Sequence, residues 1–436
     1  MPANAAVVTG ASVTFCRRAF ASPLTLSSGT ITHITEACAE AHVAVGGREA
    51  IGHGSMYLSD LWAWPEPTLA TAERDRILRT ICQRIAADLA DHVGGGPAHP
   101  LELGLHLHES CCERHATNLY GDLVPRGAEP TKLAVAMCVS PFDAAIHDAV
   151  GVALNRSAMD LYDDGAALPT ADRWLAGSGA LAIREMLGRP SDRRLPVWWI
   201  VGPGDVLPDA LATPVGQWGV SRFKMKIMGR DARADAERTA AVYAAARQLG
   251  ASDITISVDS NEANPDAESV ADYLEALASK SREAFEALAY LEQPTGRDIQ
   301  QHAFDWHTVG ARKPVLLDEG LTSLGLLDEA KRQGWSGLAM KTCKGHSFVL
   351  VAAAWALGHD MVISLQDLTN PGRAAIHAAL LAARLPTMNG VELNSRQFTP
   401  EANVDWLPQY GGLFEPRDGV HRLPAGRVVG LHVEAH

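Results

Sequence analysis

The sequence predicts an α/β protein in which a (β/α)8-type barrel follows an N-terminal α+β region. Two observations support this prediction. From about residue 195 onward, short apolar segments alternate with longer amphipathic stretches through eight units. Before that point, strand-like segments with Gly-rich turns are followed by helical patterns. Parallel strands need a crossover connection, so strands separated by helices indicate a parallel sheet, and eight such units can close into a barrel.

The N-terminal region is expected to begin with strands and to continue with helices. The strand-like segments are residues 11–15, 31–45 and 49–54. Apolar residues at helical spacing follow at residues 70–93, 102–115, 139–154 and 181–187. A Gly-Arg-Pro sequence at residues 188–190 ends the last helix, so we expect a boundary near residue 190.

The barrel is expected to occupy most of the remaining chain. Its strand-like segments are residues 197–201, 222–226, 254–258, 288–291, 315–317, 337–340, 361–364 and 390–393. The helical patterns between them are residues 207–219, 232–249, 268–288, 324–333, 347–357 and 371–384. The first of these helices is weak because it carries two prolines.

Composition narrows the class of protein. The 436 residues are 47% hydrophobic and 20% charged, which is ordinary for a globular protein. With 38 Lys and Arg against 51 Asp and Glu, the net charge is −13, and we expect no nucleic-acid or membrane partner. The longest apolar run, residues 348–358, is about half of what spans a bilayer. The first ten residues lack a signal-peptide pattern and the seven cysteines are scattered, so we expect reduced thiols and a cytoplasmic location.

Charged residues end five consecutive strands of the expected barrel. In such barrels the chemistry lies at the carboxyl ends of the strands, so these side chains should form one ring. Their intervals, between 23 and 33 residues, each correspond to about one βα unit. The residues are Lys224 and Lys226, then Asp259, then Glu292, then Asp318 and Glu319, and finally Lys341.

Three converging carboxylates flanked by lysines indicate a particular chemistry. The acids would repel one another unless a cation lay among them, and oxygen ligands favour a hard ion such as Mg²⁺. Lys224 and Lys226 lie two apart on one strand, so they share a face and each should lower the pKa of the other. This arrangement suits removal of a proton next to a carboxylate, with the metal stabilising the enediolate.

These motifs resemble those of the enolase superfamily, and most closely those of muconate lactonizing enzyme and mandelate racemase-like proteins. The matching strings are Phe-Lys-Met-Lys at 223–226, Val-Asp-Ser-Asn at 258–261, Leu-Glu-Gln-Pro at 291–294, Leu-Asp-Glu-Gly at 317–320, Met-Lys at 340–341 and the helix at 140–149. The resemblance implies a capping domain at residues 1–190, and a barrel at 191–436 whose C-terminal segment returns to the cap. It also implies Mg²⁺ held by Asp259, Glu292 and Asp318, with Glu319 the less favoured ligand. Lys226 and Lys341 would be the acid/base pair, assisted by Lys224.

Other positions depart from the family pattern. The seventh strand ends without the histidine of the mandelate racemase subgroup, which favours Lys/Lys chemistry. Asp367 either orients substrate or caps the following helix. The eighth strand offers Glu392 and lacks the paired aspartates of dipeptide epimerases.

Two N-terminal segments, residues 22–28 and 52–57, are expected to be loops that touch substrate. His53, Ser55 and Tyr57 in the second loop are candidates for substrate binding, together with Asn261, Asp367 and Glu392. The His and Cys residues between 106 and 115 have no regular zinc spacing, and we expect them to pack as an ordinary helix face.

The sequence therefore predicts a Mg²⁺-dependent enzyme acting on a small carboxylate. Racemisation or epimerisation by the Lys/Lys pair is favoured. Dehydration of a hydroxy acid and cycloisomerisation of a muconate-like diacid stay open as alternatives. A homo-oligomer is also expected, because the resemblance implies one and the Ala-rich helix around residues 240–246 offers apolar surface.

Overall fold

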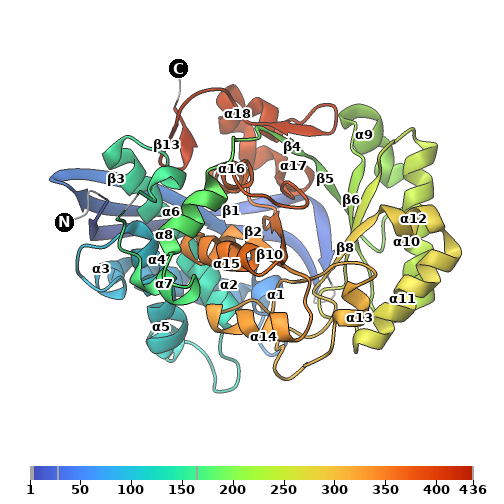
Figure 1. Cartoon of the computed structure of the whole chain (residues 1–436), viewed down its shortest axis with the longest axis horizontal. Helices are drawn as coiled ribbons and strands as arrows, with labels where there is room; N and C mark the ends of the chain where they lie inside the picture. The colour runs from blue at the N-terminus through green and yellow to red at the C-terminus, as the bar shows by residue number, and fades with distance from the viewer. Residues whose placement is uncertain (1–3, 27–28, 164, 435–436) are drawn as a thin grey trace.

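The computed structural model describes residues 4–26, 29–163 and 165–434. It has two regions, an N-terminal cap of mixed strands and helices and a C-terminal region built on a parallel sheet. In Figure 1 the cap helices α2 to α6 lie to the left and the helices α10 to α12 of the parallel sheet lie to the right. The α/β class and the order of the two regions are as predicted.

The cap is built on an antiparallel sheet of three long strands. They are β1 (Ala6–Leu26), β2 (Gly29–Val45) and β3 (Arg48–Tyr57), in the order β1-β2-β3. Its helices are α1 (Asp60–Ala63), α2 (Thr71–Ala87), α3 (Leu89–His92), α4 (Pro100–Glu109), the π-helical turn η1 (Ser110–Arg114), α5 (Ala116–Tyr120), α6 (Lys132–Leu154), η2 (Ala158–Asp160), α7 (Pro169–Trp174) and α8 (Gly179–Leu187).

Helix α6 is the central helix of the cap. It is long and apolar enough to cross a membrane, yet the whole of its most apolar window is buried inside the protein. One face of the cap sheet packs on it, with Ala37, Ala39 and Ala41 of β2 fully or almost fully buried. A core helix enclosed by protein on every side needs no amphipathic pattern, which explains its composition.

Two glycines of β3 allow the sheet to approach α6 closely. A Cβ added at Gly54 would lie 2.0 Å from the carbonyl oxygen of Pro141, and one added at Gly52 would lie 2.1 Å from the backbone nitrogen of Ala149. Both obstacles are backbone atoms of a buried helix, so they cannot move aside cheaply.

We therefore expect Gly54→Ala to lower the free energy of unfolding by about 3 kcal/mol, the upper range for overpacking a rigid interior. Gly10→Ala in β1 is the matched control, because a Cβ there meets nothing within 4 Å. Urea unfolding of the two variants is the measurement. Equal stabilities would show that the sheet and helix are not held at this separation.

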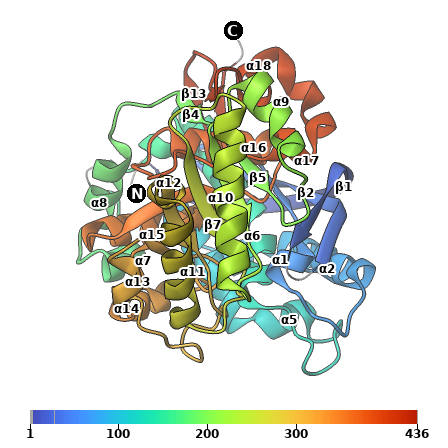
Figure 2. The same ribbon diagram turned by 90° about the vertical axis from the view of Figure 1, so that its right-hand side faces the viewer.

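The second region is built on seven parallel strands in the order β11-β10-β9-β8-β7-β6-β5. They are β5 (Trp198–Val201), β6 (Arg222–Lys226), β7 (Thr255–Asp259), β8 (Leu288–Glu292), β9 (Val315–Leu317), β10 (Gly337–Lys341) and β11 (Val362–Gln366). The helices between them are α9 (Asp209–Trp218), α10 (Ala232–Gln248), α11 (Ala267–Lys280), α12 (Arg282–Ala287), α13 (His307–Gly310), η3 (Leu324–Leu326), α14 (Leu327–Arg332), η4 (Thr342–Lys344), α15 (His346–Gly358) and α16 (Gly372–Ala382). Figure 2 shows α10 and α11 on the outside of this sheet.

Shorter elements complete the C-terminal part of the chain. They are α17 (Ser395–Phe398), η5 (Pro400–Trp406), α18 (Leu407–Phe414), the strand β12 (Val420–Arg422), which pairs with β4 (Arg194–Pro196), and the hairpin of β13 (Val428–Val429) and β14 (His432–Val433). Asp148 of α6 accepts hydrogen bonds from the backbone nitrogens of Leu431 and His53, at 2.7 and 2.9 Å. The end of the chain is thereby attached to the cap.

The eighth strand of the expected barrel is reduced to one bridge, between Gln366 and Glu392. Amide side chains connect this segment to β5. Gln397 hydrogen-bonds both the nitrogen and the oxygen of Ile200, at 3.0 and 2.8 Å, and Asn394 donates to the oxygen of Trp198 at 3.1 Å. Within the described residues, the parallel sheet thus has seven ladder-forming strands, and side chains take the place of the eighth strand's outer ladder.

Buried histidines give the fold a pH dependence. Burial lowers the pKa of His99, His377 and His421 to about 4 each. The unfolded chain binds protons on these groups from about pH 6.5 downward, while the folded chain does not until about pH 4. Their contribution to stability is therefore complete above about pH 6.5 and is lost as the pH falls toward 4.

We expect the free energy of unfolding to fall steeply between pH 6.5 and 4, by up to about 1.4 kcal/mol per pH unit for each such histidine. In His421→Asn, whose amide can still donate to the oxygen of Leu413, the slope should decrease. Urea titrations at several pH values measure it. An unchanged slope in the variant would mean that His421 is not held neutral by the fold.

Candidate active site

The predicted charged residues lie together at the carboxyl end of the parallel sheet. The register explains why, since Lys226 is paired with Asp259 across β6 and β7, and Asp259 with Glu292 across β7 and β8. Paired residues on neighbouring strands direct their side chains to the same face. Asp318 directly follows β9 and Lys341 ends β10, so the ring continues around the sheet.

Each of the three central carboxylates is bound by a lysine. The Nζ atom of Lys224 donates to both oxygens of Glu292 at 2.8 Å. That of Lys226 lies 2.6 Å from Oδ2 of Asp259, and that of Lys341 lies 2.6 Å from Oδ2 of Asp318. All of these side chains are buried, Lys226 being the most exposed at 11%.

Two members of this network were not predicted from the sequence. Lys344 is 1% exposed and its Nζ atom lies 2.6 Å from the carbonyl oxygen and 3.2 Å from Oδ1 of Asp318. Gln366, at the end of β11, hydrogen-bonds Glu292 and lies 3.3 Å from Lys224. The signal for Lys344 was its place three residues after Lys341 in the turn that follows a strand, where a charged side chain can fold back toward the strand end.

The lysine pKa values differ from the expectation. Burial alone would lower the pKa of Lys341, but Asp318 and Glu292 raise it above the ordinary lysine value. For Lys224 too, burial alone would lower the pKa, but the carboxylates Glu292 and Glu392 raise it above the ordinary lysine value. At Lys341 and Lys224 the effect of neighbouring amines is therefore outweighed by the surrounding acids, and these two amines are held as ammonium ions while those acids are ionised.

Two acids of the same network have raised pKa values. Burial raises the pKa of Glu292 to about 7, against the opposing effect of Lys224. Burial, together with Asp318 and Asp259, raises the pKa of Glu319 to about 8. The buried acids of this region outnumber its lysines by six to four, the acids being Asp259, Glu292, Asp318, Glu319, Asp367 and Glu392 and the lysines Lys224, Lys226, Lys341 and Lys344.

This donor set fits a divalent cation. The charge excess of two carboxylates matches one Mg²⁺, and oxygen atoms on neighbouring strand ends are the ligands that this ion prefers. In the described part of the chain, no group of three or more Asp, Glu, His or Cys side chains is arranged as a metal site. Lys226 and Lys341 form ion pairs with two of the ring carboxylates instead. Binding of the ion would release Lys226 and Lys341 from Asp259 and Asp318, respectively.

Asp318 and Glu319 have different surroundings. Asp318 points toward Lys341 and Lys344, in line with the other two ring carboxylates. Glu319 accepts hydrogen bonds from the indole nitrogen of Trp62 at 2.9 Å and from Asn261 at 3.0 Å. Asp318 therefore lies with the other two ring carboxylates, whereas Glu319 links the sheet to the cap.

A small cavity lies where the cap covers the strand ends, and we call it the mouth cavity. It measures about 50 Å³. The sheet region contributes polar groups, among them Lys224, Lys226, Lys341, Asp367 and Glu392, and the cap contributes mainly apolar ones, Leu24, Ile31, Ile34 and Trp62. The ring of Trp62 lies 4.8 Å from Nζ of Lys341 and thereby contacts the amine directly.

The prediction of a loop at residues 52–57 is wrong, because these residues form the end of strand β3. His53 does not line the mouth cavity; it is half-exposed, 3.6 Å from Glu40. Tyr57 is fully buried, and its backbone nitrogen donates to Asn370 at 2.8 Å. Ser59 and Trp62, which follow the strand, line the cavity instead. In the other expected loop, residues 22–26 continue β1, and residues 27–28 lie outside the described residues.

The remaining predicted binding residues divide into two groups. Asp367 and Glu392 line the mouth cavity, whereas Asn261 lies behind it and hydrogen-bonds Lys226 at 2.9 Å. Asp367 does not cap the following helix; it accepts a hydrogen bond from the nitrogen of Thr369 at 2.8 Å. Its second oxygen is buried and has no hydrogen-bond partner among the described residues, so it is free to bind a substrate group.

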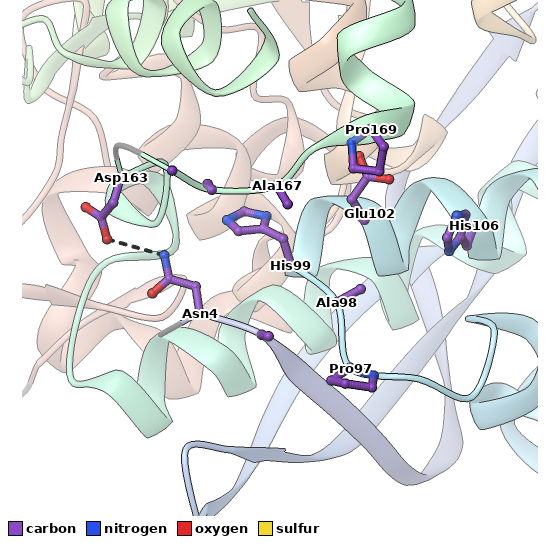
Figure 3. A pocket seen from close by; sticks show the side chains of 12 residues that line it. Asn4, Pro97, Ala98, His99, Glu102, His106, Asp163, Ala167 and Pro169 are labelled. Atoms are coloured by element: carbon purple, nitrogen blue, oxygen red, sulfur yellow. Dashed lines mark hydrogen bonds between the residues drawn. The ribbon is translucent and has the colours of Figure 1, made fainter. Parts of the chain in front are cut away.

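Another cavity, of about 380 Å³, lies within the cap beside α4 (Figure 3). Most of its polar side chains are engaged in structural hydrogen bonds. Glu102 accepts from the backbone nitrogens of Thr170 and Ala171 at the start of α7, and His99 bonds the oxygen of Leu161 at 3.1 Å. The His and Cys residues predicted to pack as a helix face lie nearby, where His108 stacks on Phe348 and both cysteines are buried.

Comparison with known proteins places this fold and site in a family. A family profile described as enolase C-terminal domain-like matches residues 208–434, which is more than half of the chain. The chain belongs to this family, within the enolase superfamily. No curated protein sequence matches it significantly.

Solved structures show the same fold over nearly the whole chain. A muconate lactonizing enzyme from Pseudomonas fluorescens, complexed with muconolactone, is 18% identical with a TM-score of 0.65, covering 99% of this chain and 97% of that one. An N-succinyl Arg/Lys racemase from Bacillus cereus is 16% identical with a TM-score of 0.62, covering 99% and 96%. A dipeptide epimerase from Enterococcus faecalis, complexed with Mg and a dipeptide, is 17% identical with a TM-score of 0.60, covering 98% and 99%.

Proposed function

We propose that the protein is a Mg²⁺-dependent enzyme that removes the proton α to a substrate carboxylate and returns one to the opposite face, as a racemase or epimerase. One observation carries this proposal. Lys226 and Lys341 come from strands four positions apart in the sheet order, and both line the mouth cavity. Two bases on different sides of one cavity are what inversion at a carbon atom requires.

Asp259, Glu292 and Asp318 would hold the metal, which would bind the substrate carboxylate and stabilise the enediolate. Lys341 would meet the substrate from the side covered by Trp62, and Lys226 from the side where Asn261 positions its amine. Lys224, 2% exposed and surrounded by acids, would stay an ammonium ion and stabilise negative charge. The cap would exclude water, because it closes the cavity with apolar side chains.

The cavity is too small for a substrate in its present form. A volume of about 50 Å³ holds a few water molecules, since each occupies about 10–15 Å³ on this measure. We infer that the strands bearing Leu24 and Ile34 move away from the sheet to admit substrate. The same enolate could instead expel a β-hydroxyl group or be formed in cycloisomerisation, and the polar groups Asp367 and Glu392 could serve either reaction.

Hydrogen exchange with solvent separates these reactions. The enzyme would be incubated in D₂O with Mg²⁺ and a panel of carboxylates: muconolactone, mandelate, a Leu-Tyr dipeptide and N-succinyl-arginine. Proton NMR reports loss of the α-proton, and polarimetry reports inversion. Exchange with inversion supports the racemase, and a 2-keto product trapped with semicarbazide supports the dehydratase. Lys226→Met/Lys341→Met is the control, because it keeps the length of both side chains without the bases.

We also expect a homo-oligomer. Helix α10 buries Ala236, Ala240, Ala245 and Ala246 within the fold and exposes only Ala234, Ala241 and Ala244, so the expectation rests mainly on the association that the family resemblance implies. Sedimentation at low micromolar concentration should show a species larger than the 46.5 kDa chain. A single species of chain mass would contradict this expectation.

A further inference from the structure

A cavity of about 280 Å³ lies on the face of the cap sheet opposite to α6, and we call it the sheet-face cavity. Ser55 is paired with Cys38 and His53 with Glu40, so these four side chains share that face. The start of α16 and the ring of Trp406 lie across from them. Neither the proposed reaction nor the packing of the cap uses this cavity.

Among the described residues, one buried hydrogen-bond donor without a partner lines the cavity, and two more lie near the start of α16. Ser55 lines the cavity, is 5% exposed, and its hydroxyl has no partner in the part of the chain that the structure describes. Asn403 and Asn370 flank the start of α16 and are 2% and 0% exposed. Each uses its side-chain oxygen on a backbone nitrogen, those of Gly372 and Tyr57, which fixes the amide orientation. Their amide nitrogens have no hydrogen-bond partner within residues 4–26, 29–163 and 165–434.

The positive charge near this cavity is also incompletely paired. Helix α16 has 11 residues and begins beside the cavity. Asn403 takes its first backbone N–H, that of Gly372, but Pro371 at the N-cap offers no side-chain cap, so the positive end of the helix dipole still favours an anion there. Arg373 in its first turn stacks on Trp406 at 5.4 Å and forms no ion pair with any described carboxylate. By contrast, Arg18 is neutralised by Glu36 at 2.7 Å.

We propose that the sheet-face cavity binds a small organic carboxylate. The carboxylate group would be held by the guanidinium of Arg373, the hydroxyl of Ser55 and the amino end of α16. A planar guanidinium matches a carboxylate with two parallel hydrogen bonds. Glu40, which no arginine or lysine of the described residues neutralises, lines another part of the cavity, so a polyanion such as a nucleotide would be repelled.

This site is distinct from the mouth cavity, since the two share no lining residue. A short segment of chain connects them, because Asp367 and Thr369 line the mouth cavity and Gly372 lines the sheet-face cavity. Asn370, between these residues, is bonded to the backbone of β3. A ligand in the sheet-face cavity would therefore contact the chain at Gly372, three residues after Thr369 of the mouth cavity.

Isothermal titration calorimetry of the full chain with succinate tests the proposal, with EDTA present so that no metal in the mouth cavity binds the probe. Arg373→Gln should weaken the affinity by about 10-fold or more, as expected for loss of a charged hydrogen bond. Ser55→Ala should weaken it by a smaller factor. The matched control is Arg396→Gln, whose guanidinium stacks on Trp218 at 5.2 Å away from this cavity and whose loss should leave the affinity unchanged.

Equal affinities of wild type and both cavity variants would overturn the proposal and assign the binding to the lysines of the mouth cavity. Absence of succinate binding at 10 mM, on the order of the weakest affinity that the method resolves, would overturn it too. Inorganic phosphate provides the second probe. Phosphate that binds more tightly than succinate, with loss in Arg373→Gln, would overturn the carboxylate assignment.

Discussion

Lys341→Ala is expected to lose racemisation yet to keep exchange of the α-proton in one enantiomer of the substrate. The enantiomer whose proton faces Lys226 should still exchange with solvent, because its base is intact. Lys226→Ala should show the opposite preference. Each variant should lose on the order of 10²–10⁴ in the overall rate, the usual contribution of a positioned acid or base.

The measurement is deuterium incorporation into each enantiomer, followed by NMR for each variant. Lys280→Ala is the control, because that lysine is half-exposed on α11 and far along the sequence from both catalytic positions. Near-normal turnover in Lys341→Ala would contradict the Lys/Lys assignment. His346 would not then be a ready substitute, since it lies against His377 at 2.8 Å and is fully buried outside the mouth cavity.

Removal of the metal or of one of its carboxylates should have the second large effect. Exhaustive chelation should abolish turnover, and added Mg²⁺ should restore it. Asp318→Asn should lose turnover permanently, because the amide cannot supply the negative charge that the ion and Lys341 require. Circular dichroism should show the fold retained, since the side chain lies at the end of the strands and not in the packed layers of the sheet.

The matched variant is Asp305→Asn, because Asp305 is exposed and belongs to the loop before α13. It should keep Mg²⁺ binding and activity. Titration of Mg²⁺ by calorimetry separates loss of the ion from loss of a later step. Full activity after exhaustive chelation would contradict the metal site.

Strand periodicity and charge position predicted much of this architecture from the sequence. The apolar segments near residues 222–226 and 337–340 form strands as predicted, and the lysines that end them, Lys226 and Lys341, follow the register of the sheet. The eighth segment was harder to predict, because a short apolar pattern does not show whether the segment forms backbone hydrogen bonds with a strand on each side. Gln397 and Asn394 supply those hydrogen bonds from side chains, which no strand periodicity reveals.

The cap was less predictable at the site itself. Small and polar residues at 52–57 suggested a loop, but Gly52 and Gly54 are small because α6 passes against β3. The contact of Trp62 with Lys341 joins residues far apart in the chain, and no local pattern announces such a pair. The pKa values of Lys341 and Lys224 also depend on tertiary contacts, because carboxylates from several strands raise them more than neighbouring amines lower them.

The seam between β5 and the segment that replaces the eighth strand has a consequence for how the sheet can deform. Rotation of the Gln397 side chain would release both backbone groups of Ile200 without breaking any ladder. Ile200 also lines the mouth cavity, beside Lys224 of the adjoining strand. The carboxyl end of the sheet therefore has one edge whose closure depends on side-chain amides and not on a backbone ladder, so this edge can open while the other strands stay in register.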